Sequence, residues 1–103
     1  MTNGTTHLTI HTFRRGTPKE SAMKVLEEAS EAREAWQQCE RWMPEVATDS
    51  DAARAEGIRM AYLAEELADC VTACCNLAAR YRIDLQDAIL RVEDRNRRRG
   101  RYA

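Results

Sequence analysis

The sequence predicts an all-α protein, an antiparallel helical bundle of three main helices. Apolar residues recur at helical spacing over two long segments, and helix-capping residues stand at the segment boundaries. The sequence shows no internal repeat, no heptad pattern, no glycine-rich phosphate loop and no apolar run of membrane-spanning length. We divide the chain into an N-terminal arm or extended segment, residues 1–16, and a helical domain, residues 17–103.

The arm is the least helical part of the chain. Leu8 and Ile10 alternate with polar residues, which is typical of extended backbone, and Gly16 closes the segment. The segment has neither the basic flank nor the apolar run of a signal peptide. We expect either an arm that lies on a partner subunit or a frayed terminus.

The first helix is predicted from Pro18 to about Met43. Thr17 and Glu20 can form a capping box, in which each side chain accepts a hydrogen bond from the other residue's backbone N–H. Pro18 suits the first helical position, and Pro44 ends the helix. One face of this helix is apolar, and we expect Trp36, which belongs to that face, to lie in the core. That face comprises Ala22, Val25, Leu26, Ala29, Ala32, Trp36, Cys39 and Met43.

The second helix is predicted to begin at a cap formed by Asp49 or Ser50 and to run to about Tyr81. A third, shorter helix follows the cap Asp84 and ends just before Gly100, which suits the left-handed position after a helix. The long helices carry more apolar surface than the short one can cover, which predicts a homodimer or homotetramer. The apolar face of the second helix comprises Met60, Leu63, Leu67, Cys70, Val71, Cys74, Leu77, Ala78 and Tyr81.

The charges balance to −1 over the whole chain, so no global field selects a polyanionic or acidic partner. We expect neither a membrane nor a nucleic acid as a partner, although six arginines gather between Arg91 and Arg101. The four cysteines form no Cys-x-x-Cys pair, and three lie within residues 70–75 of one helix. This spacing predicts buried, reduced thiols and a cytoplasmic protein.

Two matched groups of acidic residues stand on the two long helices. Residues three apart on a helix point the same way, so each group presents a pair of carboxylates to one side. A single such pair is most often solvated, whereas two pairs on antiparallel helices present four oxygen ligands, which suit Mg²⁺ that also binds phosphate. The groups are Glu27-Glu28-x-x-Glu31 and Glu65-Glu66-x-x-Asp69.

Four motifs follow one another from about Pro18 to Tyr102, and together they resemble the MazG-type all-α nucleoside triphosphate pyrophosphohydrolases. The resemblance implies Mg²⁺-dependent hydrolysis, with Mn²⁺ as a possible substitute, between the α- and β-phosphates of a nucleoside triphosphate. The products would be a nucleoside monophosphate and pyrophosphate. The motifs are Lys24-x-x-Glu27-Glu28-x-x-Glu31, Glu65-Glu66-Leu-Ala-Asp69, Ile83-Asp84-Leu85 and Asn96-Arg-Arg-Arg99.

The resemblance also implies roles for individual residues. The metal ligands would be Glu28, Glu31, Glu66 and Asp69. Glu27 and Glu65 would hold a further ion, or would orient and deprotonate the attacking water. Substrate contacts would come from Lys24, Tyr62, Asn76, Asn96 and Arg99. Tyr62 stands where the family often has a lysine, and the loop between the acidic motifs is longer than usual.

Two other functions remain open at this point. The arginines from Arg91 to Arg101 could belong to a non-enzymatic helical interaction module that binds nucleic acid. Within the same fold, the substrate could instead be a phosphoribosyl nucleotide, which only a substrate screen distinguishes from a (deoxy)nucleoside triphosphate.

Overall fold

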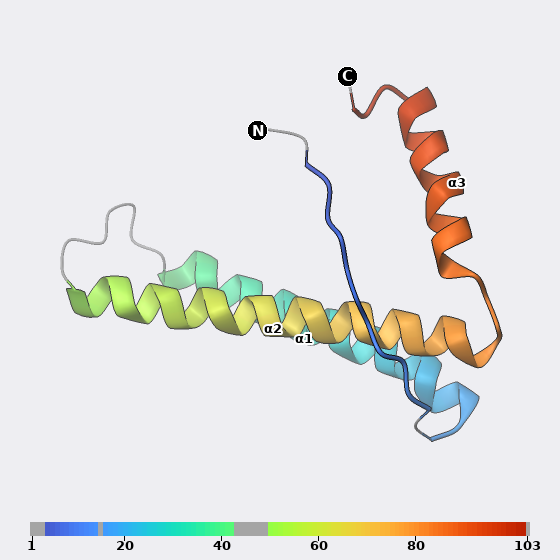
Figure 1. Cartoon of the computed structure of the whole chain (residues 1–103). Helices are drawn as coiled ribbons and strands as arrows, with labels where there is room; N and C mark the ends of the chain where they lie inside the picture. The colour runs from blue at the N-terminus through green and yellow to red at the C-terminus, as the bar shows by residue number, and fades with distance from the viewer. Residues whose placement is uncertain (1–3, 15, 43–49, 103) are drawn as a thin grey trace.

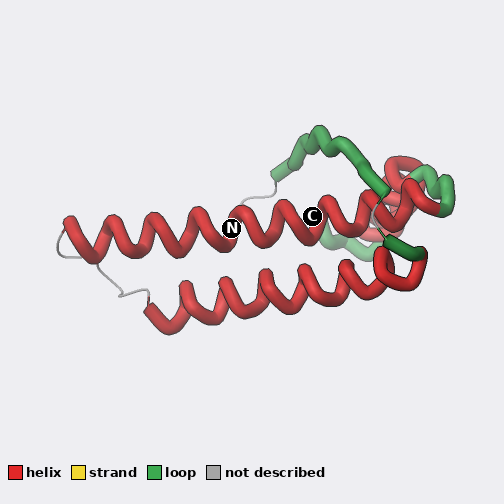
Figure 2. The backbone as a smooth tube through the Cα atoms, turned by 90° about the horizontal axis from the view of Figure 1, so that it is seen from below, coloured by secondary structure: helices red, strands yellow, loops and turns green. Residues whose placement is uncertain are grey.

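The structure, a computed structural model, describes residues 4–14, 16–42 and 50–102. This part of the chain forms three helices and no strand: α1 spans Pro18–Trp42, α2 spans Ser50–Arg80 and α3 spans Leu85–Arg98. The helices α1 and α2 lie side by side and antiparallel, whereas the arm and α3 leave the pair on one side (Figures 1 and 2). The predicted all-α class is confirmed.

Helix α1 begins at the predicted capping box. The backbone N–H of Glu20 donates to Thr17 Oγ1 at 3.1 Å, and the N–H of Thr17 donates to Glu20 Oε1 at 3.2 Å. Gly16 precedes the cap with φ = 69°, and a Cβ atom there would lie 2.8 Å from Glu20 Oε2. The glycine therefore provides both the left-handed backbone and the space that the capping glutamate fills. The predicted end of the helix near Met43 lies outside the described residues.

Both ends of α3 follow the predicted signals. The side chain of Asp84 accepts a hydrogen bond from the N–H of Asp87 at 3.0 Å, as an N-cap does. Gly100 has φ = 72°, and its N–H donates to the carbonyl of Arg97 at 3.0 Å. The next N–H, of residue 101, reaches the carbonyl of Asn96 at 3.1 Å, which completes a Schellman motif.

The contact between α1 and α2 is built from small side chains and two glutamates. Cys39 Sγ lies 3.5 Å from the carbonyl oxygen of Arg59 near one end, and Arg80 donates to Ser21 Oγ at 3.2 Å near the other. Between these points, buried or half-buried residues alternate at spacings of three and four on both helices, which is the spacing of a coiled-coil interface. We call these positions the seam; they are Val25, Glu28, Ala32, Ala35 and Cys39 of α1 and Leu63, Glu66, Cys70, Ala73 and Leu77 of α2.

The seam corrects three expectations from the sequence. A heptad spacing is present, but glutamates occupy two of its positions, so a search for apolar residues misses it. Trp36 is 50 % exposed rather than in the core, because the seam lies to one side of the predicted apolar face. Among the free thiols Cys39 is buried, whereas Cys74 is exposed, contrary to the expected burial.

Helix α3 packs little against the other two helices. It buries none of its residues, and the α1·α2 pair supplies the main helix contact of the described chain. Apolar side chains consequently stay exposed on all three helices, among them Leu26, Trp36, Leu67, Ile89 and Leu90. None of the described helices is both long enough and apolar enough to cross a membrane.

Candidate metal centre

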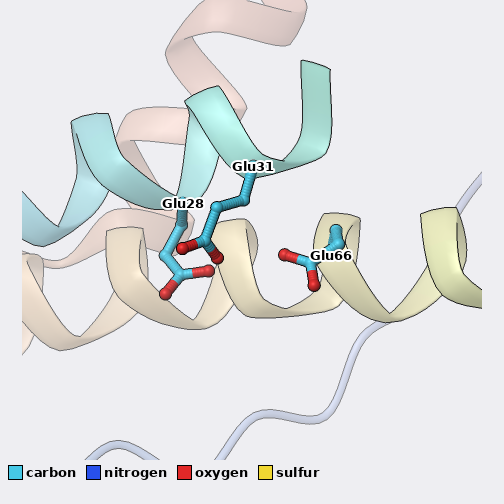
Figure 3. Close-up of side chains that lie close together, drawn as sticks. All are labelled: Glu28, Glu31 and Glu66. Atoms are coloured by element: carbon cyan, nitrogen blue, oxygen red, sulfur yellow. The ribbon is translucent and has the colours of Figure 1, made fainter. Parts of the chain in front are cut away.

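Three glutamates from the two long helices converge at the middle of the helix pair. Glu28 and Glu66 occupy the seam, and Glu31 lies three residues along α1 from Glu28 (Figure 3). One carboxylate oxygen from each residue lies within 4.8 Å of the other two. Glu28 is 7 % exposed and Glu66 is 8 % exposed, while Glu31 is half-buried. We call these three residues the glutamate cluster.

The cluster holds carboxylate oxygens that the described protein does not satisfy. Glu28 Oε2 and Glu66 Oε2 are both buried and accept no hydrogen bond. A buried acceptor without a partner costs about 1–3 kcal/mol, and more when it is charged. Two such oxygens beside a third carboxylate are therefore unfavourable unless a positive charge or a proton joins them.

The pKa of Glu31 also reflects the closeness of the three carboxylates. It is raised above its ordinary value of 4.5, first by the negative charge of Glu28, then by burial, and then by hydrogen bonds with Glu28 and Glu66. Glu31 therefore binds a proton more readily than an isolated carboxyl group does, because a proton relieves part of the repulsion in the cluster.

A divalent ion with hard oxygen ligands fits this donor set. Oxygens bound to one Mg²⁺ are at most about 4.2 Å apart, twice the metal–oxygen distance. Oxygens already within 4.8 Å of one another need only small side-chain rotations to reach that spacing. The absence of imidazole and thiolate ligands from the cluster favours Mg²⁺ or Mn²⁺ over softer metals.

The fourth predicted ligand, Asp69, lies next to the cluster rather than within it. Its side chain is exposed and, together with Glu28, lines a neighbouring pocket. Asp69 follows Glu66 by three residues on α2, so both lie on adjoining parts of the same helix face. The structure therefore brings together three of the four predicted ligands and places the fourth at the edge of the pocket.

Lys24 brings a positive charge into contact with the cluster. Its Nζ lies 3.0 Å from Glu28 Oε1 and 3.3 Å from Glu27 Oε1. These contacts raise the pKa of Lys24, with the hydrogen bond to Glu28 first and that to Glu27 second. Lys24 therefore satisfies one oxygen of Glu28 and leaves Oε2 unpaired.

Tyr62 and Glu65 flank the cluster on α2 and differ in their surroundings. The pKa of Tyr62 is raised, first by the charge of Glu66, then by burial and a hydrogen bond with Glu66. The raised pKa favours the neutral phenol of Tyr62, which lies one turn before Glu66 on α2. Glu65 is exposed and lines neither pocket found among the described residues.

A pocket of about 610 Å³ adjoins the cluster. It lies between the first turns of α1, the second half of α2 and the arm, and Glu28 belongs to both the pocket and the cluster. Its volume falls within the range of small-molecule sites, about 300–1,000 Å³. Its lining comprises Phe13, Glu20, Ser21, Met23, Lys24, Glu27, Glu28, Asp69, Thr72, Ala73 and Asn76.

The arm is fixed to this pocket by a contact that the sequence did not indicate. The backbone N–H of Phe13 donates to Asn76 Oδ1 at 2.8 Å. Asn76 was predicted to contact substrate; in the structure its amide lines the pocket and holds the arm against α2. Phe13 and Asn76 are 63 residues apart, so no local sequence pattern connects them. The sequence around Phe13 does not indicate that this residue lines a pocket.

The two predicted substrate contacts from α3 and its C-cap, Asn96 and Arg99, do not reach this pocket within one chain. Asn96 donates to the hydroxyl of Tyr102 at 3.2 Å, and that hydroxyl donates to Glu93 Oε2 at 2.7 Å. Neither Asn96 nor Arg99 lines the pocket, and α3 projects away from the helix pair (Figure 1). Any contact between these two residues and a ligand in the pocket requires a second copy of the chain or a movement of α3.

No protein-family model, curated protein or solved structure matches this chain.

Proposed function

We propose that the protein is a Mg²⁺-dependent pyrophosphohydrolase that cleaves a (deoxy)nucleoside triphosphate between the α- and β-phosphates. The observation that carries this proposal is the convergence of Glu28, Glu31 and Glu66, with two buried oxygens unpaired, beside a pocket of ligand size. The order of the motifs along the chain, which resembles MazG-type enzymes, supports the same reaction. Mn²⁺ is expected to replace Mg²⁺, because both prefer oxygen ligands.

The cluster supplies the ligands for the ion, and Asp69 at the pocket edge is placed to join them or to bind a further ion. When bound, such an ion neutralises phosphate oxygens and lowers the pKa of a coordinated water. Lys24 contributes a second positive charge on the pocket wall, and its raised pKa keeps it protonated. The ion and Lys24 together offset the negative charge that a triphosphate brings into an acidic pocket.

Hydrolysis needs a base for the attacking water. A new bond forms between the water oxygen and the α-phosphorus, the bond from that phosphorus to the bridging oxygen breaks, and the water loses its proton. Glu27 lines the pocket, which supports it as the acceptor of that proton, whereas Glu65 lies outside both pockets. We assign the role of base to Glu27 and keep Glu65 as a candidate ligand for a further ion.

We also propose that the active form is a cytoplasmic homodimer or homotetramer. Apolar side chains that a stable domain normally covers, such as Leu26, Trp36 and Leu67, are exposed on the helix pair. A second copy packed on this surface would cover them. It would also give Asn96 and Arg99 a route to the pocket of a neighbouring chain.

The test is a pyrophosphate-release assay with Mg²⁺ over the common ribo- and deoxyribonucleoside triphosphates and a phosphoribosyl nucleotide. Glu66→Gln is expected to reduce turnover to background, and Glu27→Gln to reduce it roughly 100-fold, the usual contribution of a general base. Glu40→Gln, an exposed acid of α1 outside the pocket, is the matched control. Turnover of no nucleotide, or full turnover by Glu66→Gln, would refute the proposal.

Nucleic-acid binding by the arginines of α3 remains the second candidate. Arg91 and Arg98 each pair with an aspartate one turn earlier, at 3.0 and 3.2 Å, which reduces the net positive charge of that helix. One binding measurement distinguishes the pyrophosphohydrolase from the nucleic-acid-binding module. Binding to a polynucleotide that weakens steeply with salt and persists without Mg²⁺ would favour the interaction module.

A further inference from the structure

The pocket beside the glutamate cluster has two chemically different ends. Glu28, Lys24 and Asp69 bring ionic groups to the end that adjoins the cluster, whereas Glu20, which also lines the pocket, uses its carboxylate to accept the capping hydrogen bond from Thr17. Seven residues after Asp69, about 10 Å further along α2 at 1.5 Å per residue, Asn76 marks the other end. Between these two ends, Thr72 and Ala73 line the pocket.

At the second end, the arm contributes a side chain to the wall of the pocket. Phe13 lines the pocket and is 54 % exposed, so its ring is not used to fill the core. Met23 of α1 is likewise exposed and lines the same pocket. An aromatic and a thioether side chain left accessible in one pocket are typical of a surface that receives a flat apolar group.

The position of Phe13 is fixed by a hydrogen bond. Its backbone N–H donates to Asn76 Oδ1 at 2.8 Å, which ties the arm to α2 at the level of the pocket. In Figure 1 the arm crosses the helix pair near the end where α1 begins and α2 finishes. A second, smaller pocket of about 150 Å³ lies on the other side of the same contact, between the arm and the last turns of α2.

We propose that Phe13, held by Asn76, forms the wall against which the nucleobase of the substrate stacks. The inference rests on the proposed function, because the ionic end of the pocket then receives the polyphosphate and its metal. The arm becomes part of the substrate site in this arrangement. Asn76 acts as a positioning residue through its carbonyl oxygen, and Thr72 supplies a hydroxyl between the two ends.

The experiment compares two triphosphate ligands, of which only one carries a nucleoside. Binding of a non-hydrolysable α,β-imido nucleoside triphosphate and of inorganic tripolyphosphate is measured by calorimetry, each with Mg²⁺. Phe13→Ala is expected to weaken nucleotide binding roughly tenfold or more, as the loss of one base–aromatic stack does, and to leave tripolyphosphate binding unchanged. Phe13→Tyr is expected to restore nucleotide binding.

Leu8→Ala is the matched control, because Leu8 is an exposed apolar residue of the same arm that lines neither pocket. It is expected to leave both affinities unchanged. Asn76→Ala is expected to reproduce the selective loss. Asn76→Asp keeps an oxygen acceptor for the N–H of Phe13 and is expected to preserve the ratio of the two affinities.

The outcomes separate this inference from the function on which it rests. If the unmodified protein binds neither ligand, the proposed function itself fails, and the stacking wall with it. If the nucleotide binds but Phe13→Ala matches Leu8→Ala, only the stacking wall is refuted. An equal loss of nucleotide and tripolyphosphate binding in Phe13→Ala would also refute it, because the residue would then act on the whole fold.

Discussion

The seam between α1 and α2 contains two kinds of position that share the same geometry and carry opposite chemistry. At the seam positions Ala32, Ala35 and Cys39, the side chains are small, apolar and buried. Glu28, one turn before Ala32, and Glu66 of α2 occupy positions with the same spacing and are buried almost as deeply. The backbone does not distinguish the two kinds of position.

The difference indicates what the glutamates contribute. An alanine at a seam position lowers the free energy of the folded chain by burying apolar surface and letting the helices approach closely. A buried glutamate with an unpaired oxygen raises it, and placing a second and third glutamate nearby raises it further. Such a cost in the middle of the main helix contact is expected where a protein binds a cation.

The largest predicted effect comes from placing a further carboxylate at an apolar seam position. Ala35 is 2 % exposed, and Ala35→Glu would bury a carboxylate one turn after Glu31, which adds repulsion to the cost of burial. We expect the free energy of unfolding to fall by about 3 kcal/mol or more, as for other uncompensated buried charges. Urea denaturation followed by circular dichroism measures this change.

Gln38→Glu provides the control for Ala35→Glu, because it adds the same charge at an exposed position of α1. It should change the free energy of unfolding by no more than about 0.5 kcal/mol. Equal stability of Ala35→Glu and Gln38→Glu would mean that the seam tolerates a further charge, and the contrast between its apolar and acidic positions would lose its meaning.

The sequence predicted the helices well because their signals are local. The capping box at Thr17 and Glu20, the cap at Asp84 and the left-handed Gly100 each depend on residues within a few positions, and all form as expected. Apolar periodicity located the helices but misplaced the contact, because exposed residues such as Trp36 belong to the same wide apolar face. A wide face shows that a helix packs, and only the partner helix decides which part of it is covered.

The candidate site was predicted in part for the same reason. The spacing of the acidic motifs identified Glu28, Glu31 and Glu66, whose convergence depends on the register of two antiparallel helices. The sequence placed Glu66 at the border of the apolar face, whereas the structure buries it in the seam. The contact of Phe13 with Asn76 could not be predicted, since it joins an arm without regular structure to a helix 63 residues away.

A smaller effect is expected from removing the charge of one glutamate in the cluster. Glu66→Gln keeps the size of the side chain, gives the site an amide donor and relieves repulsion with Glu28 and Glu31. We expect the metal-free protein to gain about 1 kcal/mol in the free energy of unfolding, roughly the value of one buried hydrogen bond. Thermal melts in the presence of a chelator would then show a rise of about 4–8 °C.

The same variant is expected to lose its response to metal. The unmodified protein should melt at a higher temperature as Mg²⁺ or Mn²⁺ is added, because the ion binds only the folded state. The stabilisation reaches about 2.7 kcal/mol at 100 times the dissociation constant. Glu66→Gln should show little of this rise, and Glu40→Gln all of it. If Glu66 served only to stabilise the fold, Glu66→Gln would be less stable than the unmodified protein and would keep the full response to metal.

The smallest predicted effect is a dependence of stability on pH that arises from Glu31. Its pKa is raised in the folded chain, first by the charge of Glu28, so the folded state binds the proton more tightly than the unfolded state does. The stability that this proton provides is complete below the ordinary value of 4.5 and is lost as the pH rises through the raised folded pKa. The metal-free protein should therefore lose stability relative to Glu31→Gln over that interval.

The free energies of unfolding of the two proteins, measured by urea denaturation at a series of pH values with a chelator present, give this difference directly. The comparison with Glu31→Gln cancels the titration of groups that both proteins share. Saturating Mg²⁺ should reverse the trend, because an ion bound to the cluster favours the ionised carboxylate and its affinity grows with pH. A difference that stays flat with pH in the presence of the chelator would show that the folded chain does not bind the Glu31 proton more tightly than the unfolded chain does, and the argument for a cation at the seam would then rest on the unpaired oxygens of Glu28 and Glu66 alone.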